Sequence, residues 1–323
     1  MTAAIASKQR EVRPSTRRSL ERAVGYEITG PPSAPVIVAL GGISATRHVA
    51  AGDHDSTPGW WDSTVGPGRA IDTATYRVLG VDFLDGGRRG DGRPRHIVTT
   101  HDQATAIGRV LDTLGVSRVH AFVGASYGGM VALAFAQRYP ERVERLIAIS
   151  APHEAHPMST ALRSLQRRIV QLGLDAKRGG DALAIARGLA MTTYRTAREF
   201  AGRFKSAADA VTENDATFPV EAYLEHHGEQ FAARWSAERF LALSLSGDLH
   251  RVEPESIRTP TVIVAAEGDV IVPAEQLESL AARLGGPNRL VHLPTAHGHD
   301  AFLTEPRKLG RILRTILSSE NVS

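Results

Sequence analysis

The segment with the clearest chemical signature is residues 124–128, which read Gly-Ala-Ser-Tyr-Gly and match the pattern Gly-x-Ser-x-Gly. An apolar run at 119–123 precedes it, and a helical pattern begins at Met130. In this context the serine is expected on a tight, strained turn between a strand and a helix, with its hydroxyl exposed at the sheet edge. The pattern therefore predicts Ser126 as a nucleophile for acyl transfer or acyl hydrolysis.

A serine hydroxyl needs a base, and the base needs an acceptor that fixes its tautomer. In this type of fold the acid and then the histidine follow the serine along the chain. Asp269 comes just after a predicted strand, and His299 stands just before the last predicted helix, so we assign them as acid and base. His297 is the alternative base. Asp248 is the alternative acid, but it precedes the last two predicted strands.

The oxyanion formed during acyl transfer needs backbone N–H donors. One is expected from Tyr127, directly after the nucleophile. The other is expected from the loop after the first buried strand, with Gly42 as the candidate and Leu40 and Ile43 as open alternatives. Histidines 297 and 299 beside acidic residues could also suggest a metal site, but a third convincing ligand is missing, so no metal is predicted.

Alternating elements must position these residues. Short apolar runs predict strands at 35–40, 76–82, 118–124, 143–150, 260–266 and 289–293, and helical patterns lie at 101–114, 130–139, 274–284 and 302–316. Such alternation is typical of an α/β fold with a mostly parallel sheet covered by helices on both faces. Together with the serine turn it predicts the α/β-hydrolase fold.

The alternation stops at residues 152–254, where helical periodicity, many arginines and no convincing strand are found. We interpret this interval as a helical cap inserted into a core made of 25–151 and 255–323. The carboxyl ends of the strands in an open α/β sheet bind ligands, so a cap there would shape the pocket and exclude water.

Composition narrows the remaining possibilities. The 323 residues include no cysteine, which excludes disulfides, thiolate metal sites and a cysteine nucleophile. The net charge is +3, and the first 24 residues carry six Lys or Arg against two Glu, so the basic character belongs to a tail that we expect to be poorly ordered. With no membrane-length apolar run and no secretory signal, we expect a soluble cytoplasmic protein that binds neither membrane nor nucleic acid.

Several segments resemble the MetX-type homoserine O-acyltransferases of the α/β-hydrolase superfamily. They are Pro-Gly-Trp-Trp at 58–61, Gly-Pro-Gly-Arg-Ala-Ile-Asp-Thr at 66–73, the serine turn through Met130, residues 186–195, and Gly-His-Asp-Ala-Phe-Leu at 298–303. The resemblance implies transfer of an acyl group from an acyl-coenzyme A to the hydroxyl of L-homoserine in methionine biosynthesis. It also implies a cytoplasmic homodimer, with the acyl-coenzyme A as a substrate and no cofactor.

The resemblance further implies substrate roles for Arg187 and Asp300. Arg187, Met191 and Tyr194 are spaced by four and three residues, so they fall on one helix face and Tyr194 can reach the same ligand as Arg187. A planar guanidinium suits the acceptor's carboxylate, and Asp300 beside the base could hold its ammonium group.

The acyl donor is the open question. The short chain and the loop at 84–89 look like the branch of the family that uses succinyl-coenzyme A, and we favour that donor over acetyl-coenzyme A. The segment 159–172 predicts an apolar helix face made of Leu162, Leu165, Ile169 and Leu172. Arg163 and Arg167, one turn apart beside that face, could bind the succinyl carboxylate.

Other activities share the same triad. A serine acceptor in place of homoserine, a serine esterase, and a hydrolase-fold binding protein without catalysis remain alternatives. The Trp-Trp segment, Arg187 and Asp300 favour a transferase with a charged amino-acid acceptor.

Overall fold

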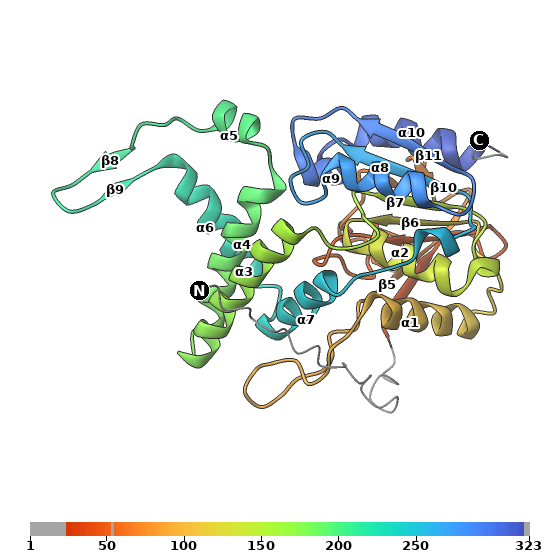
Figure 1. Ribbon diagram of the computed structural model, residues 1–323, viewed down its shortest axis with the longest axis horizontal. Coiled ribbons are helices and arrows are strands. Elements are labelled where there is room, and N and C mark those ends of the chain that lie inside the picture. Colours follow the sequence, from red (N-terminus) through yellow and green to blue (C-terminus); the bar gives the residue numbers. More distant parts are fainter. Residues whose placement is uncertain (1–23, 53–54, 320–323) are drawn as a thin grey trace, which may run out of the picture.

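The computed structural model describes residues 24–52 and 55–319, and a central sheet organises them. The sheet has seven strands in the order β1-β5-β2-β6-β7-β10-β11 (Figure 1). Its strands are β1 (Tyr26–Thr29), β2 (Val36–Leu40), β5 (Arg77–Val81), β6 (Ala121–Ala125), β7 (Leu146–Ile149), β10 (Thr261–Ala266) and β11 (Asn288–Leu293). Strand β1 runs antiparallel to β5, and the other neighbouring pairs run parallel. All the strands expected from the sequence are present, and β1 is an addition. The basic tail expected at 1–24 lies, apart from Val24, outside the described residues.

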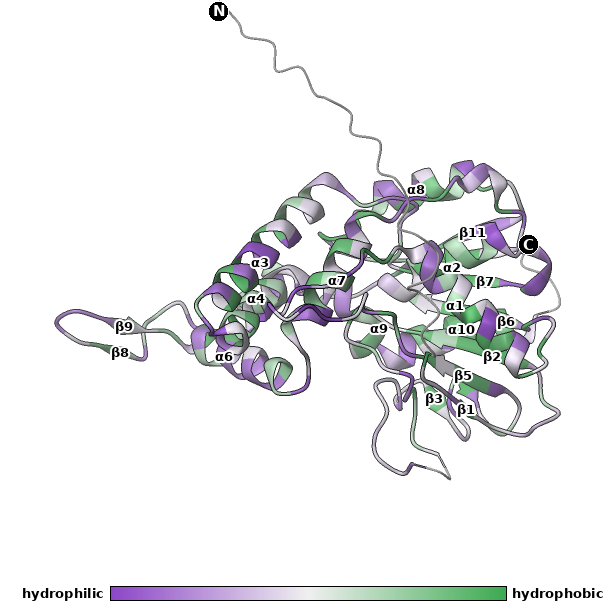
Figure 2. Cartoon of the chain, turned by 90° about the horizontal axis from the view of Figure 1, so that it is seen from below, coloured by the Kyte–Doolittle hydropathy of each residue, from purple (hydrophilic) through white to green (hydrophobic). Residues whose placement is uncertain are grey.

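Helices cover both faces of the sheet, as the sequence predicts. Alternate residues of β2 show why: Val38 and Leu40 pack into one apolar cluster, whereas Ile37 and Ala39 pack into another. The first cluster includes residues of α1 (Thr100–Thr113), α2 (Tyr127–Arg138) and α8 (Ala274–Arg283). The second includes residues of α9 (Ala301–Thr304) and α10 (Pro306–Ser318). In Figure 2 the central strands carry the hydrophobic colour, in keeping with a buried sheet.

Two helix boundaries differ from expectation. Helix α2 begins at Tyr127, directly after the predicted nucleophile, and not at Met130. The single helix expected at 302–316 is wrong, because the chain forms α9 and α10 with a break at Glu305. Pro306 causes the break, since a residue that precedes proline is disfavoured in the α conformation; Glu305 has φ −115° and ψ 51°.

The cap consists of helices α3 (Pro157–Asp175), α4 (Gly179–Tyr194), α5 (Ala197–Arg203), α6 (Pro219–Ala232) and α7 (Ala237–Asp248). It has a small apolar core of its own, which includes Val170, Leu183, Phe231 and Phe240. The expectation of no strand here is wrong: β8 (Ala210–Val211) and β9 (Ala216–Thr217) form a short hairpin. Two-residue strands are too short to leave a sequence pattern. All these elements fall inside 152–254, which stays the proposed extent of the cap.

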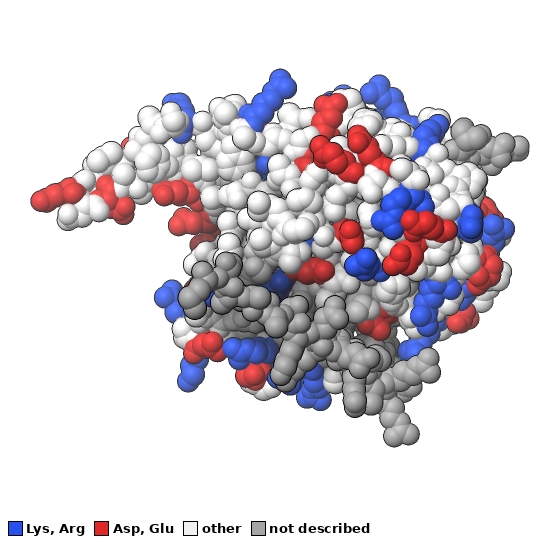
Figure 3. Space-filling view, viewed as in Figure 1, with Lys and Arg blue, Asp and Glu red and all other residues white. Residues whose placement is uncertain are grey.

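The hairpin ends an arm that projects away from the body of the molecule (Figures 1 and 2). In Figure 3 acidic side chains lie at the tip of this arm, where the sequence has Glu213 and Asp215, while basic and acidic side chains are interspersed over the core. The remaining elements are short: β3 (Val65–Gly66), β4 (Ile71–Asp72), η2 (Pro140–Arg142), η3 (Pro254–Ser256) and η4 (Gly298–Asp300). Within the described ranges, none of the helices combines the length and apolar character that a membrane span needs.

Candidate active site

Ser126 alone forms the turn between β6 and α2. Its φ of 53° and ψ of −122° lie in a backbone region that residues other than glycine rarely adopt, so the turn is strained. The flanking glycines make the turn possible. A Cβ on Gly124 would lie 2.4 Å from the carbonyl oxygen of Gly128, and a Cβ on Gly128 would lie 2.5 Å from that of Leu40. The strain and the close packing fix the direction of the serine hydroxyl.

Three loops at the carboxyl ends of β6, β10 and β11 bring Ser126, Asp269 and His299 together. Ser126 Oγ lies 2.7 Å from His299 Nε2, and His299 Nδ1 lies 2.7 Å from Asp269 Oδ2. The other oxygen of Asp269 accepts the backbone N–H groups of Ile271 and Val272, both at 2.9 Å. These two donors fix the plane of the carboxylate.

The carboxylate sets the tautomer of the histidine. Because ionised Asp269 can only accept hydrogen bonds, His299 donates from Nδ1 and leaves Nε2 free to accept the Ser126 proton. Burial by itself would lower the pKa of His299. The charge of Asp269, its hydrogen bond and the charge of Asp300 outweigh burial and hold that pKa above its ordinary value. The arrangement therefore stabilises the imidazolium that forms after proton transfer.

The alternative acid and base have other partners. His297 Nδ1 lies 2.9 Å from Glu199 Oε2. Asp248 lies in the cap and pairs with Arg163 and Arg167. The structure thus brings His299 and Asp269, and neither alternative, to the serine.

Two backbone segments meet at the position expected for an oxyanion. Tyr127 is the first residue of α2, so its N–H has no acceptor within the helix. The carbonyl of Gly41 accepts the N–H of Gly128 at 2.8 Å, which joins the loop after β2 to the serine turn. A Cβ on Gly42 would lie 4.0 Å from Ser126 Cβ, and Gly42 and Ile43 both line the cavity. Leu40, the remaining alternative, is the last residue of β2.

The side chain of Tyr127 has a role that the sequence did not reveal. Its hydroxyl lies 2.7 Å from Ser246 Oγ on α7 and accepts a hydrogen bond from Gln103 Nε2 on α1 at 3.3 Å. Burial raises the pKa of Tyr127 to about 12, so the phenol stays neutral. The residue after the nucleophile is therefore hydrogen-bonded both to the cap helix α7 and to helix α1 of the core.

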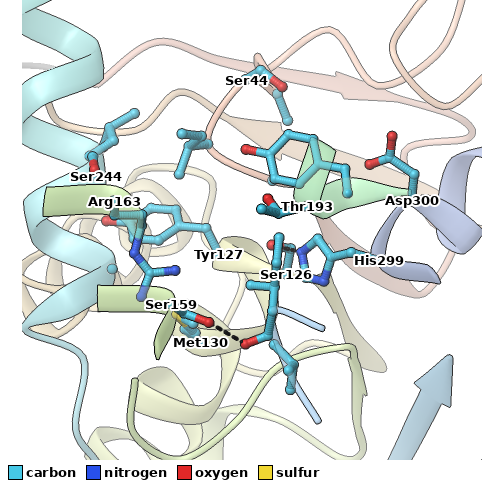
Figure 4. Close-up of a pocket in the computed structure, with 18 of the residues that line it drawn as sticks. Ser44, Ser126, Tyr127, Met130, Ser159, Arg163, Thr193, Ser244, His299 and Asp300 are labelled. Atoms are coloured by element: carbon cyan, nitrogen blue, oxygen red, sulfur yellow. Dashed lines mark hydrogen bonds between the residues drawn. The ribbon is translucent and has the colours of Figure 1, made fainter. Parts of the chain in front are cut away.

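A cavity of about 1070 Å³, including its open mouth, lies between the core and the cap and contains Ser126 and His299 (Figure 4). Arg163 and Asp300 lie on opposite sides of Ser126 in Figure 4. Sequence reasoning gave no cavity role to Trp60, Ser159, Gln166, Thr193 or Ser244, which also line it. Trp60 is inside the matched segment 58–61, so a signal for it was present.

On one side of Ser126, the structure brings Arg187, Tyr194 and Asp300 to the cavity wall. The Arg187 guanidinium lies 5.0 Å from the ring centroid of Tyr194 and 4.9 Å from that of Phe231. Asp300 is buried, and its Oδ2 lies 3.2 Å from Nε of Arg195. Burial raises the pKa of Asp300 above its ordinary value, although the charges of Arg195, His299 and Arg187 oppose the shift. Arg195 ends the matched segment 186–195 and was given no role from the sequence.

On the other side of Ser126, Arg163 lines the cavity, whereas Arg167 lies beside it and binds Ser244 Oγ and Asp248.

The predicted apolar face of helix α3 is wrong in part, because Leu165 and Leu172 are 50% and 69% exposed. The buried row of α3 is instead Ser159, Gln166 and Val170. Ser159 and Gln166 of this row line the cavity, and Val170 packs into the apolar core of the cap. Within the described residues, no cluster of three or more His, Asp or Glu suits a metal ion.

Comparison with known proteins agrees with this geometry. A model of the alpha/beta hydrolase fold family matches residues 35–306. A homoserine O-succinyltransferase of Xanthomonas campestris is 44% identical over 90% of this chain and 78% of its own. The chain belongs to the homoserine O-acyltransferases of the α/β-hydrolase fold family. Other relatives in this family include a homoserine O-acetyltransferase of Thermus thermophilus, 35% identical over 80% of this chain and 72% of its own. A serine O-succinyltransferase of Frateuria aurantia is 32% identical over 87% and 89%.

Solved structures share the fold of this family. A homoserine O-acetyltransferase from Bacillus anthracis superposes with a TM-score of 0.82 over 93% of both chains at 21% identity. The esterase E22 superposes with a TM-score of 0.80 over 91% of this chain and 94% of its own at 24% identity. These likenesses show the α/β-hydrolase fold, which the sequence predicted, and leave the reaction to be argued from the site.

Proposed function

We propose that this chain is an acyl-coenzyme A:L-homoserine O-acyltransferase that uses succinyl-coenzyme A and carries the acyl group on Ser126. The observation that carries the proposal is the cavity itself. The triad of Ser126, His299 and Asp269 lies between the cationic Arg163 on one side and the oppositely charged Arg187 and Asp300 on the other. The 44% identity to a homoserine O-succinyltransferase supports the same reaction.

The first half-reaction acylates the enzyme. Ser126 Oγ attacks the thioester carbonyl carbon while His299 Nε2 takes its proton. The backbone N–H groups of Tyr127 and Gly42 stabilise the oxyanion that results. The tetrahedral intermediate then breaks its carbon–sulfur bond, and His299 returns the proton to the departing sulfur of coenzyme A.

The second half-reaction transfers the acyl group to the acceptor. His299 Nε2 takes the proton of the homoserine hydroxyl, whose oxygen attacks the acyl-Ser126 carbonyl carbon. Collapse releases O-acylhomoserine, and His299 returns the proton to Ser126 Oγ. One base thus serves both steps, and a single position holds the leaving thiol and then the attacking alcohol.

Arg187, Tyr194 and Asp300 bind the acceptor in this proposal. Because two aromatic rings flank the Arg187 guanidinium, its orientation is restricted and its N–H edge suits a carboxylate. Asp300 follows the base directly, which puts a carboxylate near the site for the acceptor's ammonium group. An acceptor with both charges satisfies both residues, whereas water or a simple alcohol does not.

Arg163 binds the donor carboxylate. Its Nη2 is buried and has no hydrogen-bond partner within the described residues. A buried, unpaired donor on a charged group costs more than an ordinary one, so a ligand carboxylate in this position is stabilising. An acetyl group cannot supply that partner. Arg167 contributes its charge and the contacts to Ser244 and Asp248.

The family resemblance also supports a homodimer in the cytoplasm that needs no cofactor besides its two substrates. The oligomeric state is testable by light scattering on the purified chain. A mass near that of two 34.7 kDa chains is expected. A mass near that of one chain would refute the dimer and leave the reaction untouched.

A matrix of donors and acceptors tests the function. Succinyl- or acetyl-coenzyme A is combined with homoserine, serine or water, and free thiol and acylated product are measured. We expect succinyl-coenzyme A with homoserine to give the highest kcat/KM, and Arg163→Ala to lower it selectively for the succinyl donor. The exposed Arg168→Ala on the same helix is the matched control. A preference for acetyl-coenzyme A, for serine or for water would refute the donor, the acceptor or the transferase assignment respectively.

A further inference from the structure

Asp248 is the last residue of α7, and its carboxylate lies between two arginines of α3. Arg163 Nε donates to one oxygen at 2.6 Å, and Arg167 Nη1 donates to the other at 2.5 Å. The side chain of Asp248 is 6% exposed. Arg167 Nη1 also lies 3.0 Å from Ser244 Oγ, one turn earlier on α7. Both oxygens of the carboxylate are engaged, so its plane is fixed.

The way in which Arg163 meets this carboxylate determines where its free end points. The hydrogen bond to Asp248 uses Nε, and the terminal nitrogen Nη2 is buried without a partner within the described residues. Figure 4 shows the guanidinium at the cavity wall, between Ser244 and Ser159. Asp248 therefore holds the Nε end of a guanidinium whose residue lines the cavity.

The contact with Asp248 affects both the local charge around Arg163 and the conformational freedom of its side chain. Two arginines one turn apart repel each other, and a free arginine side chain has many rotamers. Asp248 cancels one of the two positive charges and holds Nε, which sets the guanidinium plane. The cluster of Arg163, Arg167 and Asp248 keeps one net positive charge, which matches a donor with one terminal carboxylate.

We propose that Asp248 is a positioning residue for the acyl donor: it aims the terminal nitrogens of Arg163 at the carboxylate of a dicarboxylic acyl group. This inference rests on the proposed use of succinyl-coenzyme A. It makes donor selectivity a property of the contact between α7 and α3, and not of Arg163 alone. A misaligned charged group loses much of its interaction even when its charge remains.

The direction in which Asp248→Asn changes the preference for succinyl- over acetyl-coenzyme A separates a positioning role from simple charge balance. Asp248→Asn removes a negative charge and leaves two net positive charges near the donor carboxylate. If Asp248 served only to reduce the local charge, the ratio of kcat/KM for succinyl- over acetyl-coenzyme A would rise. If it positions Arg163, that ratio falls, by roughly tenfold to a hundredfold, with the larger part of the change in KM for the succinyl donor. A ratio that is unchanged or higher overturns the proposal.

Asp248→Glu provides a second test that does not require removal of a buried charge. It keeps the net charge but moves the carboxylate by one methylene. A positioning role therefore predicts a lower ratio of kcat/KM for succinyl- over acetyl-coenzyme A, whereas a role in charge balance alone predicts no change in that ratio. Asp181→Asn, which removes an exposed cap carboxylate paired with Arg178, is the control and leaves the ratio at the wild-type value. In an Arg163→Ala background, Asp248→Asn should change the ratio no further. An undiminished effect there would overturn the proposal.

The outcomes also distinguish the positioning role of Asp248 from the proposed use of succinyl-coenzyme A. A wild-type enzyme that prefers acetyl-coenzyme A overturns both the donor assignment and the positioning role. A wild-type succinyl preference that survives Asp248→Asn and Asp248→Glu overturns the positioning role and leaves the donor assignment intact.

Discussion

The most informative single perturbation of the triad is Asp269→Asn, because the structure predicts which way the new amide must face. One carboxylate oxygen accepts the N–H groups of Ile271 and Val272, and only an oxygen can replace it there. The amide nitrogen must then face His299 Nδ1, at the position that is now 2.7 Å away. The imidazole would accept at Nδ1, carry its hydrogen on Nε2, and lose the ability to deprotonate Ser126.

This loss has a predictable size. In serine proteases the corresponding tautomer change lowers kcat by about 10⁴, or about 5.5 kcal/mol of transition-state stabilisation. We expect a similar fall in thiol release from succinyl-coenzyme A with saturating homoserine. The chain should stay folded, since the amide oxygen keeps both backbone donors satisfied. Glu267→Gln, which removes an exposed charge two residues away, is the control. More than a tenth of the wild-type kcat in a folded Asp269→Asn variant would refute the tautomer argument.

Three further predictions address the acceptor, the cap and the pH profile. Arg187→Lys should lower kcat/KM for homoserine by roughly tenfold to a hundredfold, because an ammonium group cannot replace a stacked, planar guanidinium. If hydrolysis of the acyl-enzyme falls equally, Arg187 is structural. Tyr127→Phe should lower the free energy of unfolding by about 1 to 2 kcal/mol, measured by denaturant titration, because Ser246 and Gln103 lose a buried partner; no change would contradict the tie to α7. Protonated His299 cannot act as a base, and its pKa is raised, so kcat/KM should fall with decreasing pH with a midpoint above 6.5. A flat profile between about pH 5 and 8 would disprove the assignment of the base.

The sequence predicted the parallel strands because each is a short apolar run buried on both faces, as in β2. Strand β1 left no such signal, since its residues are only partly buried at the sheet edge. The split between α9 and α10 was readable in advance from Pro306. Strands β8 and β9 lack the length that periodicity needs.

Within the cavity, chain order and the serine turn identified Ser126, Asp269 and His299 as a group that the structure brings together. The partners of Arg163 could not be predicted, because Asp248 is 85 residues away and depends on how α7 packs against α3. The prediction that the apolar face of α3 is buried failed for a related reason. A helical apolar row is expected to face the protein, but the inward row here includes Ser159 and Gln166, which line the cavity, and Leu165 and Leu172 are exposed.

The central claim is that the acyl group passes through Ser126, and mass spectrometry of the acyl-enzyme tests it most directly. The enzyme is mixed with succinyl-coenzyme A without acceptor, quenched in acid and digested, and the peptide that contains Ser126 is examined. We predict one succinyl group on Ser126, which disappears when homoserine is added before the quench and is absent from Ser126→Ala. Rapid turnover with both substrates while Ser126 stays unmodified, or full activity of Ser126→Ala, would contradict the account.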